Sequence, residues 1–325
     1  MKVERSPGDV SIFRCLFICA CLLLGSARLS AGQSVAHADE SETADESEIV
    51  AGKEVVHWSG LPVWGGKEAS DSGHELPLPL GLSGNVFYSI EQNFDLSKVA
   101  LGTPGGKLLD LGSLVRVTNV KVSETATTSR LDAWVLPFLN VYAIVGYVQG
   151  HAHIDVRPAT IPGLRAHGPK LDFRLQFDGP TVGLGTTLAG GYRPFKGRET
   201  VVFGLADINF TRTFLDFEHV VSMLDPVDVA VLSMRLGVRE RICENTPFGA
   251  AYVSLWGGGM YQGVQETMKG RLGLVDLRFR ADVQAADPWS GLIGGRVELG
   301  EHLILTTEVG FGDRKTIMFE LNYRF

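Results

Sequence analysis

The sequence is poor in cysteine beyond its first residues. Cys15, Cys19 and Cys21 lie near the N-terminus, and Cys243 stands alone in the rest of the chain. An intramolecular disulfide would need a cysteine from the N-terminal segment, so it is excluded if that segment is removed.

The sequence also lacks long apolar runs and an excess of positive charge. No run reaches the roughly 20 apolar residues of a transmembrane helix, which argues against a helical transporter. Asp and Glu total 37 against 30 Lys and Arg, which excludes a strongly basic nucleic-acid binder. A hydrophobic content of 45% excludes a disordered chain, and 325 residues favour one large domain or at most two.

Motifs of common catalytic sites are missing as well. After residue 38 there is no G-x-S-x-G, H-E-x-x-H or C-x-x-C. The glycine cluster Gly102–Lys107 lacks the spacing of a phosphate-binding loop and its following Ser or Thr, so we interpret it as a turn. The sequence therefore predicts no cofactor, no resident metal and no enzyme activity.

The N-terminus is typical of a secretory signal peptide. Basic residues precede the apolar run Cys15–Gly25, and Ala36–Ala38 provides a cleavage motif. We predict that residues 1–38 are a signal peptide cleaved after Ala38, with Ala31 as the second choice. An uncleaved anchor is the alternative, but the run is too short to span a bilayer.

Residues 39–82 are predicted to form an acidic, mostly irregular extension. Six acidic residues fall within residues 39–48, and their mutual repulsion favours a solvated tail. The stretch that follows is rich in Gly, Pro and Trp, which favours an extended leader without regular structure. Its alternative role is to plug a pore. Residues 83–325 are then the folded domain.

From residue 83 to residue 325, apolar and polar residues alternate with a period of two. The C-terminal segment from Ile317 to Phe325 is apolar at every odd position. In Val275–Val283 the odd positions are apolar and the even positions hold four charged residues, Asp276, Arg278, Arg280 and Asp282. A helix would not place these charges on one side, so the pattern predicts strands.

Length and polarity distinguish a membrane barrel from a soluble sandwich. Predicted strands such as Tyr142–Val156 and Ala250–Gly263 run for 14 or 15 residues, whereas soluble strands average about 5–6. A tilted membrane-spanning strand needs about 9–11 residues plus an overhang, and a charged face is costly inside a dry core. We predict an all-β fold, a transmembrane antiparallel up-and-down β-barrel whose apolar faces contact lipid.

Thirteen strand segments can be delimited, an odd number that single-chain bacterial barrels do not have. The short segment 170–177 is interpreted as an extension of a surface hairpin, which leaves about twelve strands. Fourteen is the second choice.

Several segments resemble known proteins. The terminal strand with Tyr323 and Phe325 resembles the C-terminal assembly signal of Gram-negative outer-membrane β-barrels. Five segments resemble those of an uncharacterised family of such proteins: Leu76–Gly81, Trp134–Tyr142, Gly258–Gln262 with Gln265 and Glu266, Ala286–Trp289, and Gly310–Lys315. The resemblance implies a location in the outer membrane and recognition of Phe325 by the barrel-assembly machinery. It implies no activity.

Charged residues are expected to line the lumen on the faces opposite the lipid. They are Arg235, Arg239, Asp276, Arg278, Arg280, Asp282, Arg296, Glu298, Glu308 and Glu320. Both signs are present, and facing rows of them would set a transverse field that orients polar solutes. Alternatively, the groups pair with one another and close the interior, as in small barrels.

His151, His153 and Asp155 share one strand face and form a weak polar cluster. Two histidines at i and i+2 without a third and fourth ligand make a poor metal site. Polar residues at a wet lumen or rim explain them better.

The sequence therefore favours a monomeric, porin-like outer-membrane barrel that acts as a passive pore for small polar solutes. The alternative is a closed barrel that presents loops or anchors the envelope, and the third hypothesis is a membrane-embedded hydrolase or acyltransferase. Expected partners are outer-membrane lipid, lipopolysaccharide and the assembly machinery, and no nucleic acid is expected.

Overall fold

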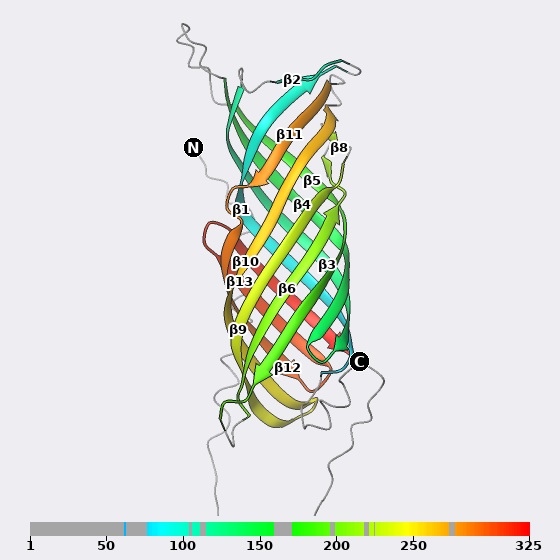
Figure 1. Ribbon diagram of the computed structural model, residues 1–325, viewed down its shortest axis with the longest axis vertical. Coiled ribbons are helices and arrows are strands. Elements are labelled where there is room, and N and C mark those ends of the chain that lie inside the picture. The colour runs from blue at the N-terminus through cyan, green and yellow to red at the C-terminus, as the bar shows by residue number, and fades with distance from the viewer. Residues whose placement is uncertain are drawn as a thin grey trace, which may run out of the picture. The chain divides into compact units, whose positions relative to one another are not determined.

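The computed structural model of the chain is a closed antiparallel β-barrel (Figure 1). It describes residue 62 and residues 77–103, 106–110, 115–158, 171–195, 199–217, 221–223, 225–272 and 277–325. Apart from residue 62, the predicted signal peptide and the predicted extension up to residue 76 lie outside the described residues. Within the described residues, no helix is long and apolar enough to cross a membrane.

The described strands number fourteen, and most are long. In chain order they are β1 (Leu80–Gly102), β2 (Leu109–Asp110), β3 (Val115–Leu136), β4 (Leu139–Pro158), β5 (Leu171–Tyr192), β6 (Val201–Thr213), β7 (Asp216–Phe217), β8 (Val221–Met223), β9 (Val227–Thr246), β10 (Gly249–Leu272), β11 (Leu277–Ala285), β12 (Trp289–Leu299), β13 (Leu303–Phe311) and β14 (Lys315–Arg324).

Ten of these strands close the ring at the end of the barrel where the chain terminates. Their order is β1–β3–β4–β5–β6–β9–β10–β12–β13–β14, and β14 pairs with β1. The backbone N–H of Leu80 donates to the carbonyl of Phe325 at 3.1 Å, and the N–H of Phe325 donates to the carbonyl of Leu80 at 2.9 Å. We call this part of the barrel the ten-strand half.

The opposite end of the barrel is a ring of eight strands among the described residues. There β7 pairs with β5 and β8, β8 pairs with β10, and β11 pairs with both β10 and β1. The eight strands are β1, β3, β4, β5, β7, β8, β10 and β11, and we call this part of the barrel the eight-strand half. In Figure 1 it is the end that carries the labels β2, β8 and β11. The wall loses two strands because the β13–β14 hairpin turns at Gly312–Arg314, short of this end.

Strand β1 changes its partner where the hairpin ends. It pairs with β14 as far as Ile90 and with β11 from Phe94 onward. A register shift lies between Ser89 and Gln92, and Glu91 has a φ of 47°, which is uncommon for a residue other than glycine. This bulge lets one strand join two successive neighbours without a gap in the wall.

The two faces of each strand exchange their character at about the same level. Along β4, the outward side chains Val145 and Tyr147 of the ten-strand half are followed by the exposed His153 of the eight-strand half. The inward side chains change in the opposite sense, from Asn140 to Ala152, and both are buried. The ten-strand half is therefore apolar outside and polar inside, whereas the eight-strand half is polar outside and apolar inside.

The predicted all-β antiparallel barrel is confirmed, and the predicted number of about twelve strands lies between the ten in the ring and the fourteen described. The predicted strand segments differ from the observed strands because the prediction divides single, very long strands into two. Asp178-Gly179-Pro180 looks like a turn but lies within β5. Pro180 has no N–H to donate, and its carbonyl accepts the N–H of Phe214 at 3.0 Å, in the interval between β6 and β7.

Candidate functional site in the barrel lumen

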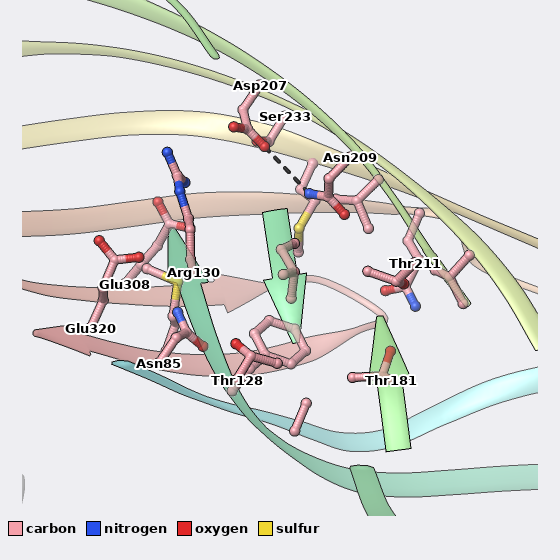
Figure 2. Close-up of a pocket in the computed structure, with 18 of the residues that line it drawn as sticks. Asn85, Thr128, Arg130, Thr181, Asp207, Asn209, Thr211, Ser233, Glu308 and Glu320 are labelled. Carbon is pink, nitrogen blue, oxygen red and sulfur yellow. Dashed lines mark hydrogen bonds between the residues drawn. The ribbon is translucent and has the colours of Figure 1, made fainter. Parts of the chain in front are cut away.

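A cavity of about 1060 Å³ occupies the barrel interior and has lining residues from both halves. Polar side chains from strands all round the ring project into its middle part (Figure 2). They include Asn85, Thr128, Arg130, Thr181, Asp207, Asn209, Thr211, Ser233, Glu308 and Glu320. Because these residues are far apart in the sequence, the site exists only when the barrel is closed.

Arg235 and Glu308 form the most buried ion pair whose partners were both predicted to face the lumen. The guanidinium of Arg235 on β9 donates twice to the Glu308 carboxylate on β13, at 2.6 and 2.9 Å. Trp256 also donates to this carboxylate, at 2.7 Å. Strands β9 and β13 are not neighbours in the ring, so the pair reaches across part of the lumen. Such two-pronged contacts are strong and fix the geometry of both side chains.

A second charged group lies on β9 and β12. The Arg239 guanidinium donates to Glu298 at 2.8 and 3.0 Å, and Arg296 lies 3.8 Å from the same carboxylate. Arg239 also stacks over the ring of Tyr252, 3.6 Å from its centroid. Glu298 therefore has two cations close to it, and the aromatic ring restrains one of them.

A third group surrounds Asp132 beside the start of β1 and the C-terminus, and it is not among the predicted lumen residues. Asn140 donates to the Asp132 carboxylate at 3.1 Å, and Arg324 donates to it at 3.2 Å. Arg130 donates to the amide oxygen of Asn140 at 3.0 Å. Asp132 follows the outward Leu131, so the alternation along β3 places it inside. That signal is present in the sequence and was overlooked.

Asp207 anchors a further cluster that was also missed. The Tyr142 hydroxyl lies 2.9 Å from both carboxylate oxygens of Asp207, and Thr187 donates to Asp207 at 2.6 Å. The Arg130 guanidinium lies over the Tyr142 ring, 3.7 Å from its centroid. Gly185 leaves the space that the Tyr142 ring occupies, because a Cβ at residue 185 would overlap that ring.

The cavity wall in the eight-strand half is largely apolar. At its boundary with the ten-strand half, Val227, Val264 and Ala285 form a buried cluster against which Phe94, Leu215 and Val229 pack. Inward residues of β1, β3, β4, β5 and β11 continue this apolar lining, and they include Leu96, Val120, Val122, Val148, Ala152, Ile154, Leu175, Phe177, Ala281 and Val283.

A buried arginine marks the boundary between the two linings. Arg314, at the turn of the β13–β14 hairpin, has no exposed surface and donates to Gln262 and, at 3.4 Å, to Ser290. Its positive charge acts on Glu124, an inward residue of β3 that lines the cavity. The hairpin turn thus places a counter-charge beside the acidic group nearest to the apolar lining.

The structure brings together six of the predicted lumen residues, which line the cavity: Arg235, Arg239, Arg296, Glu298, Glu308 and Glu320. It places those of β11 elsewhere. Arg278 and Arg280 are exposed, Asp282 follows on the same outer face, and Asp276 lies outside the described residues. Ala281 and Val283 face the cavity instead. The faces are reversed here because β11 belongs to the eight-strand half, whose exterior is polar.

His151, His153 and Asp155 also lie on the outer face of the eight-strand half, on β4. The rings of His151 and His153 are 5.5 Å apart, and His153 lies 3.8 Å from Asp172 on β5. Among the described residues, no three His, Cys, Asp or Glu side chains are arranged to hold a metal ion. These residues were expected at a lumen or rim, and the structure places them on the outer surface of the barrel.

Tyr323 and Phe325 project outward at the seam between β14 and β1, and about half of each side chain is exposed. They belong to a row of exposed aromatic residues near the C-terminal end of the barrel, which also includes Phe138 and Phe248. A second exposed row, Tyr147, Phe214, Trp289 and Phe311, lies close to the change from ten to eight strands.

Among known proteins, the similarities to this chain are to solved structures. No protein-family model matches the chain, and no curated protein matches it. Solved structures similar to it are outer-membrane β-barrels of Gram-negative bacteria. The outer membrane protein OprG from Pseudomonas aeruginosa has 16% identity and a TM-score of 0.40, over 77% of this chain and 98% of that chain. The toluene transporter TodX from Pseudomonas putida has 9% identity and a TM-score of 0.28, over 78% and 89%.

Proposed function

We propose that the chain is an outer-membrane channel through which small polar solutes diffuse. Exposed apolar side chains cover the outside of the ten-strand half, and exposed aromatic residues lie near both of its ends. Outward residues of β5 from Pro180 to Tyr192 would span about 30 Å at a tilt of about 40°, close to the height of a lipid-facing band. This exterior suits a bilayer.

The observation that carries the proposal is the cavity. It is lined by Arg, Asp and Glu side chains of both signs in the part of the barrel that would cross the membrane. Charged groups facing a lumen remain hydrated if water fills it, and they favour polar over apolar solutes along that part of the path.

The test is swelling of liposomes that contain the refolded protein, with glycerol as the permeant. Thr128→Trp places a bulky ring in the lumen, where Thr128 lines the cavity, and should slow swelling several-fold. Thr127→Trp, on the outward face of the same strand, is the matched control and should leave the rate unchanged. Equal rates in both variants would contradict passage through this lumen.

A closed structural or surface-interaction barrel is the second candidate, and the paired charges favour it. Arg235–Glu308 and Arg239–Glu298 reach between strands that are not neighbours, and each such pair narrows the path. If correctly folded protein gives no swelling above that of empty liposomes, this candidate replaces the channel.

Location and partners are part of the proposal. Export by the N-terminal signal, contact with outer-membrane lipid and lipopolysaccharide, and recognition of Phe325 by the assembly machinery would bring the barrel to its site. Deleting Phe325 should lower the amount of heat-modifiable, folded protein in outer-membrane fractions. Wild-type levels would contradict a role of this residue in assembly.

A further inference from the structure

The apolar lining of the eight-strand half is unusual for a lumen that conducts only polar solutes. Interiors of water-filled barrels are polar, because water must solvate them. Here Val227, Val264 and Ala285 are buried in a cluster where the two halves meet, and Phe94 and Val229 pack against it. Apolar surface of this kind gains free energy when an apolar solute replaces water against it.

Uncharged polar side chains lie next to this apolar part of the cavity. Thr128, Thr181, Asn209 and Thr211 surround one region of the pocket (Figure 2). The Thr213 hydroxyl, which also lines the cavity, donates to the Thr181 hydroxyl at 3.0 Å, so these two side chains are hydrogen-bonded to each other. Hydroxyl and amide groups can both donate and accept, which suits a solute with one hydroxyl or amide.

Charge is disfavoured in this part of the lumen. The positive charge of Arg314 acts on Glu124, and the next inward residues of β3, Val122 and Val120, are apolar. A charged solute would exchange its hydration for contact with apolar side chains, at a high cost in free energy.

We propose that the lumen, at the level where the two halves meet, binds an uncharged small molecule with an apolar body and one hydroxyl or amide group. The apolar body lies against Val227 and Val264, and the polar group reaches Thr213 and Thr181, since Val227 is the strand partner of Thr213. The proposal rests on the channel function above, since it names the preferred solute of the same lumen. It goes beyond that function by dividing the path into an apolar binding compartment and a polar exit.

The experiment measures binding separately from transport. 4-Nitrobenzyl alcohol is titrated into the folded protein in amphipol, and quenching of tryptophan emission is recorded, since Trp256 lines the cavity. 4-Nitrobenzoate is the charged analogue with the same body, and we expect it to bind at least roughly tenfold more weakly because its charge must be desolvated.

Two adjacent substitutions on β9 provide the matched pair. Val227→Gln places an amide in the cavity and should weaken binding of the alcohol roughly tenfold, in the range of a lost apolar contact. Asp228→Gln introduces the same side chain on the exposed outer face and should change binding less than twofold. The difference between these variants cancels partitioning of the probe into amphipol.

A third variant guards against misfolding. Val264→Thr keeps the shape of the side chain and adds one hydroxyl to the cavity wall, and we expect a few-fold loss of binding. Equal binding of the alcohol and the benzoate, or equal effects of Val227→Gln and Asp228→Gln in folded protein, would overturn the proposal. Selective binding without liposome swelling would retain the site and refute the channel. Liposome swelling without selective binding would retain the channel and refute the binding site.

Discussion

The two halves of the barrel distribute apolar and polar side chains between their inner and outer faces in opposite ways. In the ten-strand half, Leu236 and its outward neighbours on β9 are exposed and apolar, whereas Arg235 and Arg239 lie inside. In the eight-strand half, Arg278 and Arg280 lie outside, whereas Val283 is buried. A strand with period-two alternation fits lipid or water equally well, and the solvent around that part of the strand decides which face turns inward.

The largest expected loss of stability comes from a charge placed on the inner face of the eight-strand half. Val283→Asp puts a carboxylate against apolar neighbours and should lower the free energy of unfolding by about 3–5 kcal/mol. Gln284→Asp, on the exposed face of the same strand, should change it by less than about 0.5 kcal/mol. Urea unfolding followed by heat-modifiable gel mobility measures both. Equal losses would mean that the two faces of β11 do not differ.

A charge on the outer surface tests the ten-strand half. Leu236→Arg places a cation on the lipid-facing side and should cost about 2–4 kcal/mol in bilayers. Gln176→Arg puts the same residue on the exterior of the eight-strand half and should be close to neutral. If Gln176→Arg were as harmful as Leu236→Arg, the apolar band would have to extend over the whole barrel.

The buried ion pair of the ten-strand half gives a smaller effect. Arg235→Ala leaves the Glu308 carboxylate without its two-pronged partner and should destabilise the barrel by about 2–3 kcal/mol. The double substitution with Glu308→Gln should recover part of this loss, because it also removes the uncompensated charge. Strictly additive losses in unfolding experiments would show that the pair is not coupled.

Arg278→Ala should have the smallest effect. The side chain is exposed on the exterior of the eight-strand half, so stability should change by less than about 0.5 kcal/mol and single-channel ion selectivity should stay the same. The alternation in the sequence predicts instead that Arg278 lines the lumen, where its loss would change conductance. A shift in ion selectivity would therefore mean that Arg278 faces the lumen.

The alternation in the sequence was sufficient to predict strands, a barrel and the outward position of Tyr323 and Phe325. It was insufficient to assign inside and outside along every strand. The even positions of β5 are outward throughout, yet they change from Asp172 and Arg174 to Val182 and Leu184. This change can be read only if β5 is treated as one strand, and Asp178-Gly179-Pro180 conceals its continuity.

The lumen clusters could be predicted only in part for a related reason. Strand parity places Arg235 and Glu308 inside, but it does not reveal that they meet, because β9 and β13 are separated by two strands in the ring. The Asp207 cluster likewise depends on which strands face one another across the barrel. Such contacts follow from closure and tilt, which no local pattern in the sequence encodes.

The short β13–β14 hairpin also sets the width of the barrel at different heights. With neighbouring strands about 4.8 Å apart, two fewer strands shorten the perimeter by about 10 Å before tilt is considered. The cross-section is therefore smaller above the hairpin turn at Gly312–Arg314 than below it. The wider part is also the part with the apolar exterior, so the larger perimeter lies where the outer face is apolar and the smaller perimeter lies where the outer face is polar.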